Sequence, residues 1–233
     1  MADLDRSVRK PPEQAAFDRI ELTPSAFPIE TLAWSRLAKV AYRSQFYAST
    51  GSRLTPISRH FPCAYIGESP ETVVAEIWGD RFYAHRALGH PIYAIFESEA
   101  VQWQYLRVKI LPKLNLCDLT DPETLLATGF DAATLYDTEL KIPQGWAEAI
   151  ARHPAAFDGI LYRSRHTQQL CIVAWIRPSP KAVITPLASG VHVRHSGRAL
   201  DKEFEFEPVG PFLNSVSAYS VATTMRLKLS FVS

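Results

Sequence analysis

The feature that most constrains the fold is an abrupt change from a short apolar segment to a capped helix. Pro62 and Gly67 bound the apolar segment, a pattern typical of a buried strand. Ser69 then offers an N-cap side chain, Pro70 suits the first helical position, and Glu71 lies near the positive end of the helix dipole. The sequence therefore predicts a strand that is followed almost at once by a helix.

The helix that begins here carries one polar residue next to its apolar face. Val73 and Ile77, and likewise Val74 and Trp78, are four residues apart and therefore lie on one side of a helix. Glu76 falls beside that side, so we expect its carboxylate to lie near the core without being at its centre.

The remaining segments predict an α+β protein with a mixed or antiparallel sheet and flanking helices. Alternating or β-branched runs predict further strands, and capping residues predict a helix that opens at Asp121. Trp146 and Ile150, four residues apart, predict an amphipathic helix over Gly145–Arg152, behind Pro143. The predicted strands cover residues 32–37, 91–96, 101–110, 116–119, 160–162 and 170–175. Strands outnumber helices and do not alternate with them as in βαβ units. We divide the chain into an N-terminal extension (1–30), a central domain (31–178) and a β-rich C-terminal extension packed on the same domain (179–233).

Composition excludes several functional classes. The chain has 233 residues, of which 47% are hydrophobic and 21% are charged, and its formal net charge is +1. A balanced charge gives no reason to expect a nucleic-acid or membrane surface. The N-terminus lacks the apolar segment of a signal peptide, and no apolar run approaches the ~20 residues of a membrane helix. We therefore expect a cytoplasmic protein.

Three cysteines are present, at positions 63, 117 and 171, without CxxC spacing. Cys63 and Cys171 lie in apolar runs, where a free cysteine behaves as a small hydrophobic residue. The cysteines are therefore interpreted as reduced core thiols.

Common catalytic motifs are absent from the sequence, which has no GxGxxG, Walker, HExxH or GxSxG pattern. His192 and His195 are the closest histidine pair, but on a strand they would face opposite sides, so we expect no metal site. Ser164 and His166 share a strand face without forming a triad signature.

Four polar residues remain as candidates: Arg53 in a Gly-Ser turn, Tyr65 on a strand, Glu76 on the helix and Ser164 after a later strand. Arginine can bind a phosphate bidentately, an aromatic ring can stack on a base, and a carboxylate can stabilise an oxocarbenium-like centre. Arg163 and Arg165 flank Ser164 and would suit a phosphate. The set fits cleavage of an N-glycosidic bond in a phosphorylated nucleotide.

Each candidate also has a purely structural interpretation. Arg53 is explained equally by a solvated turn, and Glu76 by a surface ion pair with Arg81, which would contribute only ~0.2–0.5 kcal/mol. Tyr65 on a buried strand suits a core position, and Ser164 suits a turn cap.

Three ordered blocks of sequence resemble the RES domain family, which is named for its arginine, glutamate and serine. The blocks are Gly51-Ser52-Arg53, the run from Tyr65 to Glu76, and the run Asp158-Gly159-Ile160-Leu161-Tyr162-Arg163-Ser164-Arg165. Pro143-Gln144-Gly145-Trp146-Ala147 is also similar to the family's helix-opening segment. The resemblance covers roughly residues 34 to 175.

The resemblance implies a function and a set of site residues. RES proteins are toxins of toxin–antitoxin pairs that degrade NAD by phosphorolysis or hydrolysis, and their fold is similar to that of ADP-ribosyltransferases. Carried over, Arg53, Glu76 and Ser164 would be the catalytic set, with Tyr65 and Arg165 as further substrate-binding residues. The resemblance also implies an Xre-type helix-turn-helix antitoxin that covers the pocket, and a homodimer or a toxin–antitoxin hetero-oligomer. It implies no metal and no cofactor beyond NAD as substrate, with phosphate as a possible co-substrate.

One position departs from the family pattern. The family often has an aromatic residue directly after the turn arginine, and Leu54 stands there in this chain. Stacking on the substrate would then fall to Tyr65, Phe46 or Tyr47. Two other functions stay open at this point: transfer of ADP-ribose to a macromolecule, and a binding module without catalysis.

Overall fold

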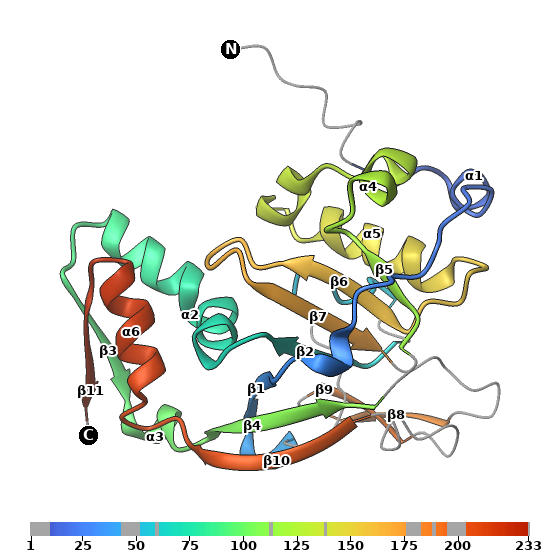
Figure 1. The fold of residues 1–233 in the computed structure, drawn as a ribbon. Helices are drawn as coiled ribbons and strands as arrows, with labels where there is room; N and C mark the ends of the chain where they lie inside the picture. Colours follow the sequence, from blue (N-terminus) through green and yellow to red (C-terminus); the bar gives the residue numbers. More distant parts are fainter. Residues whose placement is uncertain are drawn as a thin grey trace.

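The computed structural model describes residues 10–42, 52–58, 61–111, 114–137, 139–175, 183–187, 190–194 and 204–232. Its main feature is a seven-stranded sheet with the strand order β10-β4-β1-β2-β7-β6-β5 (Figure 1). The strands of this sheet are β1 (Trp34–Lys39), β2 (Cys63–Gly67), β4 (Trp103–Ile110), β5 (Leu116–Asp118), β6 (Gly159–Arg163), β7 (Leu170–Trp175) and β10 (Phe204–Pro211). Neighbouring strands are antiparallel except β5 and β6, which are parallel.

Two smaller sheets complete the β-structure of the described residues. β3 (Ile92–Phe96) and β11 (Lys228–Val232) pair in parallel, and β8 (Val183–Leu187) and β9 (Gly190–Arg194) pair as an antiparallel hairpin. The helices are α1 (Gln14–Phe17), α2 (Pro70–Ala87), α3 (Glu97–Ala100), α4 (Pro122–Thr128), α5 (Lys141–Arg152) and α6 (Val216–Thr224). Short 3-10 turns cover Ile29–Thr31, Val40–Tyr42 and Ala132–Tyr136. The predicted α+β class with a mixed, mostly antiparallel sheet is confirmed.

The helix starts follow the capping residues of the sequence. Ser69 Oγ accepts the Thr72 N–H at 3.2 Å at the start of α2, and Asp121 accepts the Thr124 N–H at 2.9 Å at the start of α4. Helix α5 begins at Lys141, four residues before the predicted start at Gly145, and so includes Pro143. Proline fits there because the first helical turn has no internal partner for its N–H groups.

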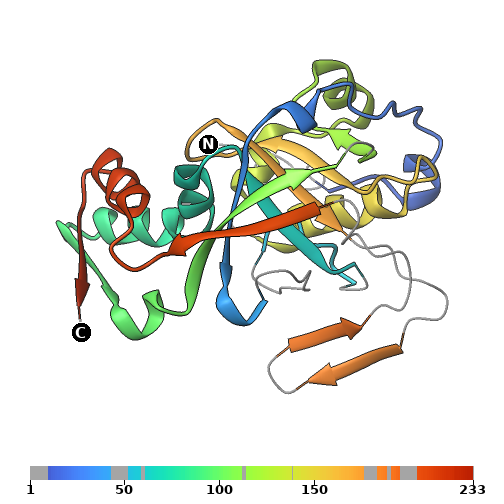
Figure 2. The ribbon, with the colours of Figure 1, turned by 60° about the horizontal axis from the view of Figure 1, so that its bottom comes forward.

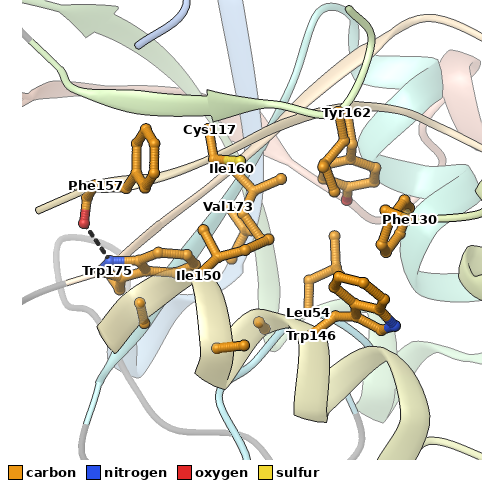
Figure 3. Packing of buried hydrophobic residues seen from close by; sticks show 14 of the residues in the cluster. Leu54, Cys117, Phe130, Trp146, Ile150, Phe157, Ile160, Tyr162, Val173 and Trp175 are labelled. Atoms are coloured by element: carbon orange, nitrogen blue, oxygen red, sulfur yellow. Dashed lines mark hydrogen bonds between the residues drawn. The ribbon is translucent and has the colours of Figure 1, made fainter. Parts of the chain in front are cut away.

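Helix α5 packs its apolar face on one face of the sheet. Trp146 and Ile150 of α5 belong to one buried cluster with Ile160, Val173 and Trp175 of strands β6 and β7 (Figure 3). The opposite sheet face has its own cluster, because successive strand residues point to opposite sides. The middle of the sheet is thus covered on both faces, which explains why β6 and β7 are continuous apolar runs rather than alternating ones.

The N-terminal segment is part of this core. Phe17 of α1 is fully buried, and its ring lies edge-on to that of Trp146 at 5.9 Å between centroids. The described part of the N-terminal extension, residues 10–30, therefore contributes to the core.

The C-terminal segment contains a helix in addition to strands. Residues 204–232 include helix α6 besides two strands, and β10 forms one edge of the main sheet (Figure 2). Phe212, which follows β10, stacks on Trp78 of α2 at 4.4 Å between ring centroids. Residues 204–232 are thus built into the same sheet and the same core as the central segment.

The three cysteines are buried and form no disulfide. Burial raises the pKa of Cys63 and of Cys117 to about 12, and it also raises the pKa of Cys171 well above its ordinary value. These thiols are therefore protonated core groups, as predicted. No helix among the described residues is long and apolar enough to cross a membrane.

Candidate functional site

A cavity of about 340 Å³ opens between helix α2, the segment 52–54 and strands β2 and β6. Arg53, Tyr65, Glu76 and Arg165, four of the five predicted site residues, are among the residues that line it. These residues come from three sequence blocks that β2, α2 and the β6–β7 connection bring together. Ser164, the fifth, does not line the cavity.

Glu76 is held by two hydroxyl groups on the sheet side of the cavity. Its Oε1 accepts a hydrogen bond from Ser164 Oγ at 2.7 Å, and its Oε2 accepts one from the Tyr162 hydroxyl at 3.0 Å. The alternative interpretation, a surface pair with Arg81, does not hold, because Arg81 contacts Glu99 at 3.1 Å instead. One donor on each oxygen fixes the plane of the carboxylate, so the Glu76 side chain is held in one orientation.

Ser164 lies behind Glu76 and not on the cavity wall. Its side chain is fully buried, and besides donating to Glu76 its Oγ accepts the N–H groups of His166 and Thr167 at 3.2 and 3.3 Å. The sequence-based hypothesis places Ser164 in the catalytic set, as a residue that orients the substrate ribose or the attacking group. In the structure its one hydroxyl proton is already directed to Glu76, which places Ser164 as a positioning residue for that carboxylate.

Tyr162 was missed in the sequence-based reasoning. Its side chain is buried, and burial together with nearby Cys171, Glu76 and Tyr65 raises the pKa of its hydroxyl well above the ordinary value. The hydroxyl therefore stays protonated and donates to Glu76. The signal was present in the sequence, because strand residues two apart share a face, so Tyr162 had to accompany Ser164.

Tyr65 supports the segment that carries Arg53. Its ring lines the cavity, while its hydroxyl accepts the Leu54 N–H at 3.1 Å and shares a hydrogen bond with Thr55 Oγ1 at 3.1 Å. The Leu54 side chain is 1% exposed and belongs to the cluster that includes Trp146. The departure from the family pattern thus concerns a residue packed in the core. Phe46 and Tyr47, the other candidates for stacking, lie outside the described residues, as do Gly51 and His195.

Two arginines meet at one carboxylate that the sequence-based reasoning also missed. Arg53 and Arg165 both contact Asp80, with Arg53 Nη2 at 3.4 Å from Oδ2. Arg53 also donates to the Asp137 carbonyl. Asp80 is four residues after Glu76, so the two carboxylates lie on the same side of α2.

His166 completes this group and holds the helix against the β6–β7 connection. Its Nε2 lies 3.5 Å from Asp80 Oδ1, and its ring packs directly on Gly79. The interaction with His166, together with those with Arg165 and Arg53, holds the pKa of the Asp80 carboxyl well below its usual range. Asp80 is therefore ionised throughout the neutral and mildly acidic range.

The cavity is thus lined by two chemically different groups. A carboxylate with fixed orientation, that of Glu76, can stabilise a developing positive charge or hold ribose hydroxyls. Two guanidinium groups, those of Arg53 and Arg165, can bind a phosphate. Among the described residues, no group of three or more histidine, cysteine, aspartate or glutamate side chains is placed to hold a metal ion.

Comparison with known proteins found a similar solved structure and a matching protein family. A chain in the crystal structure of the M. tuberculosis MbcT–MbcA toxin–antitoxin complex is 13% identical and superposes with a TM-score of 0.51, covering 91% of this chain and 96% of that one. At that identity the likeness establishes a shared fold. No curated protein sequence matches the chain.

The RES domain matches residues 29–196, well over half of the 233 residues. The matched region includes Arg53, Tyr65, Glu76, Ser164 and Arg165, and it extends beyond the segment in which the sequence blocks were recognised. This chain belongs to the RES domain family.

Proposed function

We propose that this chain is the toxin of a toxin–antitoxin pair and that it degrades NAD+ by cleaving the nicotinamide N-glycosidic bond. The observation that carries the proposal is the Glu76 carboxylate, fixed by Ser164 and Tyr162, in a cavity that Arg53 and Arg165 also line. Family membership and the fold shared with a chain of a toxin–antitoxin complex support it.

We expect NAD+ to contact both groups that line the cavity. Its pyrophosphate would bind Arg53 and Arg165, and one of its rings would lie against Tyr65. The nicotinamide ribose would then lie near Glu76, whose negative charge would stabilise the ribosyl carbon as it becomes cationic. Nicotinamide is already a cationic leaving group in NAD+, so its departure takes the bonding electron pair and gives the neutral base.

The acceptor is phosphate or water. A phosphate oxygen attacking the ribosyl carbon yields ADP-ribose 1″-phosphate, whereas water yields ADP-ribose and releases a proton to solvent. Ser164 and Tyr162 do not touch the substrate in this scheme. They keep the Glu76 carboxylate in the plane in which it faces the ribose, so the catalysis rests on electrostatic preorganisation.

The test is NAD+ consumption by the purified protein with and without phosphate, followed by chromatography of the products. Glu76→Gln keeps the size of the side chain and an acceptor oxygen for one of the two hydroxyls, while its NH2 group can donate to the other hydroxyl oxygen. The charge is removed, so we expect a folded protein with at least a hundredfold lower kcat, about 2.7 kcal/mol of barrier. Glu207→Gln is the matched control, because Glu207 forms an exposed pair with Arg107 on β4 and β10 away from the cavity. Full activity of Glu76→Gln, or intact NAD+ with every acceptor, would contradict the proposal.

The proposal includes a partner and a place of action. We expect expression of the wild-type chain to arrest growth by depleting cytoplasmic NAD+, and expression of Glu76→Gln to be tolerated. We also expect a helix-turn-helix antitoxin of the Xre type to neutralise the wild-type chain by covering the cavity, in a hetero-oligomer that can include two toxin copies. Transfer of labelled ADP-ribose to protein or nucleic acid in the same assay would favour the alternative of a macromolecular acceptor.

A further inference from the structure

We infer that Asp80 sets the affinity of this cavity for anionic phosphate groups, by occupying Arg53 and Arg165 until such a group displaces it. The inference deepens the function proposed above and rests on it for the identity of the natural anion. The geometry behind it is independent of the reaction, because it concerns only the three side chains and their surroundings.

Asp80 bridges the two guanidinium groups across the cavity. Arg53 comes from the segment before β2, and Arg165 comes from the connection after β6, so the two are far apart in sequence. Oδ2 of Asp80 faces Arg53 at 3.4 Å, and Oδ1 contacts Arg165. A carboxylate with one guanidinium on each oxygen occupies the position that two oxygens of one phosphate group would take.

The three side chains differ in how firmly they are held. The side chain of Asp80 is 55% exposed, whereas those of Arg53 and Arg165 are only 22% and 16% exposed. Arg53 has a second anchor in the Asp137 carbonyl. The carboxylate can therefore turn out to water once an anion replaces it at the guanidinium groups, while the two arginines stay in place. Asp80 is the member of the group that leaves when an anion arrives.

The positive charges around Asp80 favour its replacement by another anion. Besides Arg53 and Arg165, the cavity is lined by Arg81 and Arg163, and Arg81 is paired with Glu99. With His166 beside it, Asp80 stays ionised at neutral pH and competes with any incoming anion. A phosphate carries more negative charge than one carboxylate and accepts more hydrogen bonds, so it wins at sufficient concentration.

The experiment is calorimetric titration of inorganic phosphate and pyrophosphate into the ligand-free protein at fixed, low ionic strength. Asp80→Asn keeps the shape of the side chain but removes its charge. Because exposed ion pairs are weak, we expect the dissociation constants of both anions to be roughly two- to tenfold lower for Asp80→Asn than for the wild-type chain. Glu207→Gln changes the net charge equally at a distant pair and should leave the affinity unchanged.

Two further measurements separate competition from a merely structural role. In an Arg165→Gln background, Asp80→Asn should produce a smaller gain, because one of the two guanidinium groups for which Asp80 competes is gone. In steady-state assays of the full chain, Asp80→Asn should lower KM for NAD+ without raising kcat.

The outcomes are distinguishable from those of the proposed function. Tighter phosphate binding by Asp80→Asn without any NAD+ turnover would support the role of Asp80 and contradict the NAD+ reaction. NAD+ turnover with unchanged or weaker phosphate binding by Asp80→Asn would overturn the role of Asp80 and leave the reaction intact. Absence of phosphate binding by both proteins would also overturn it, because the inference requires an anion site at the two arginines.

Discussion

At the scale of single residues, the orientation of the Glu76 carboxylate is set by the two hydroxyl groups that donate to it. Ser164 is fully buried and Tyr162 nearly so, and each donates to one carboxylate oxygen. A hydrogen bond to a charged group contributes about 1.5–3 kcal/mol, so this small network stabilises the fold as well as orienting the carboxylate. In the proposed mechanism, the name-giving serine of the family acts through the glutamate.

This arrangement predicts the effect of removing either hydroxyl. Ser164→Ala and Tyr162→Phe should each lower the free energy of unfolding by about 1–3 kcal/mol, because an oxygen of the partly buried Glu76 carboxylate loses its donor. Each should lower kcat for NAD+ roughly ten- to a hundredfold with little change in KM, since Glu76 is no longer held in its orientation. Urea unfolding and steady-state kinetics measure the two effects.

Ser58→Ala provides the matched control. Ser58 Oγ donates to Glu148 Oε2 at 2.7 Å, a serine–glutamate hydrogen bond of the same length outside the cavity. Its removal should cost stability without changing kcat. If Ser164→Ala keeps the wild-type kcat, Ser164 does not position Glu76.

At the scale of elements, two glycines allow close contacts that bring the site together. A Cβ at Gly159, the first residue of β6, would lie 2.3 Å from the backbone carbonyl oxygen of Val173 on β7. A Cβ at Gly79 in α2 would lie 2.7 Å from the ring of His166. The first contact sets the approach of two central strands, and the second sets the approach of α2 to the β6–β7 connection.

The two contacts predict that alanine is tolerated at Gly79 and not at Gly159. Gly159→Ala should cost at least about 2–3 kcal/mol of stability, because its obstacle is backbone in the middle of the sheet. Gly79→Ala should stay within about 1 kcal/mol of wild type, since the gain in helix propensity offsets the displacement of a single ring. Thermal unfolding of both variants tests this order, and a Gly159→Ala variant as stable as Gly79→Ala would contradict it.

At the scale of the whole molecule, residues 204–232 complete both the sheet and the core. Strand β10 covers the edge of β4, and Phe212 stacks on Trp78 of the helix that carries Glu76 and Asp80. The match to the RES domain ends at residue 196, so this completion comes from outside the matched region. Helix α2 therefore depends for its packing on a segment that the family resemblance does not include.

A chain that ends at residue 203 should consequently fail to fold stably. Removal of β10, α6 and β11 would expose Trp78, Phe82 and the edge of β4, and such an edge also favours aggregation. Circular dichroism and limited proteolysis would show the loss of structure. Phe212→Ala in the full chain is the graded control, with an expected cost of about 3–5 kcal/mol and an intact fold. A folded and active shortened chain would contradict the prediction.

The sequence by itself determined the elements whose signals are local. The caps of α2 and α4, the α+β class, the buried cysteines and the three blocks of the family could all be recognised, because each depends on residues only a few positions apart. The predicted site residues could be singled out for the same reason, because these blocks carry the family pattern.

Only the tertiary structure decided which groups meet across the blocks. The pairing of β2 with β7 and of β7 with β6 brings Tyr162 and Ser164 to Glu76, and the β6–β7 connection brings Arg165 and His166 to Asp80. Hydrogen bonds and ion pairs between residues some 85 to 90 positions apart leave no periodic trace in the sequence, because they depend on strand order and not on local spacing. For the same reason, a serine expected on the cavity wall lies behind the glutamate, and an aspartate not singled out from the sequence lies between the two arginines.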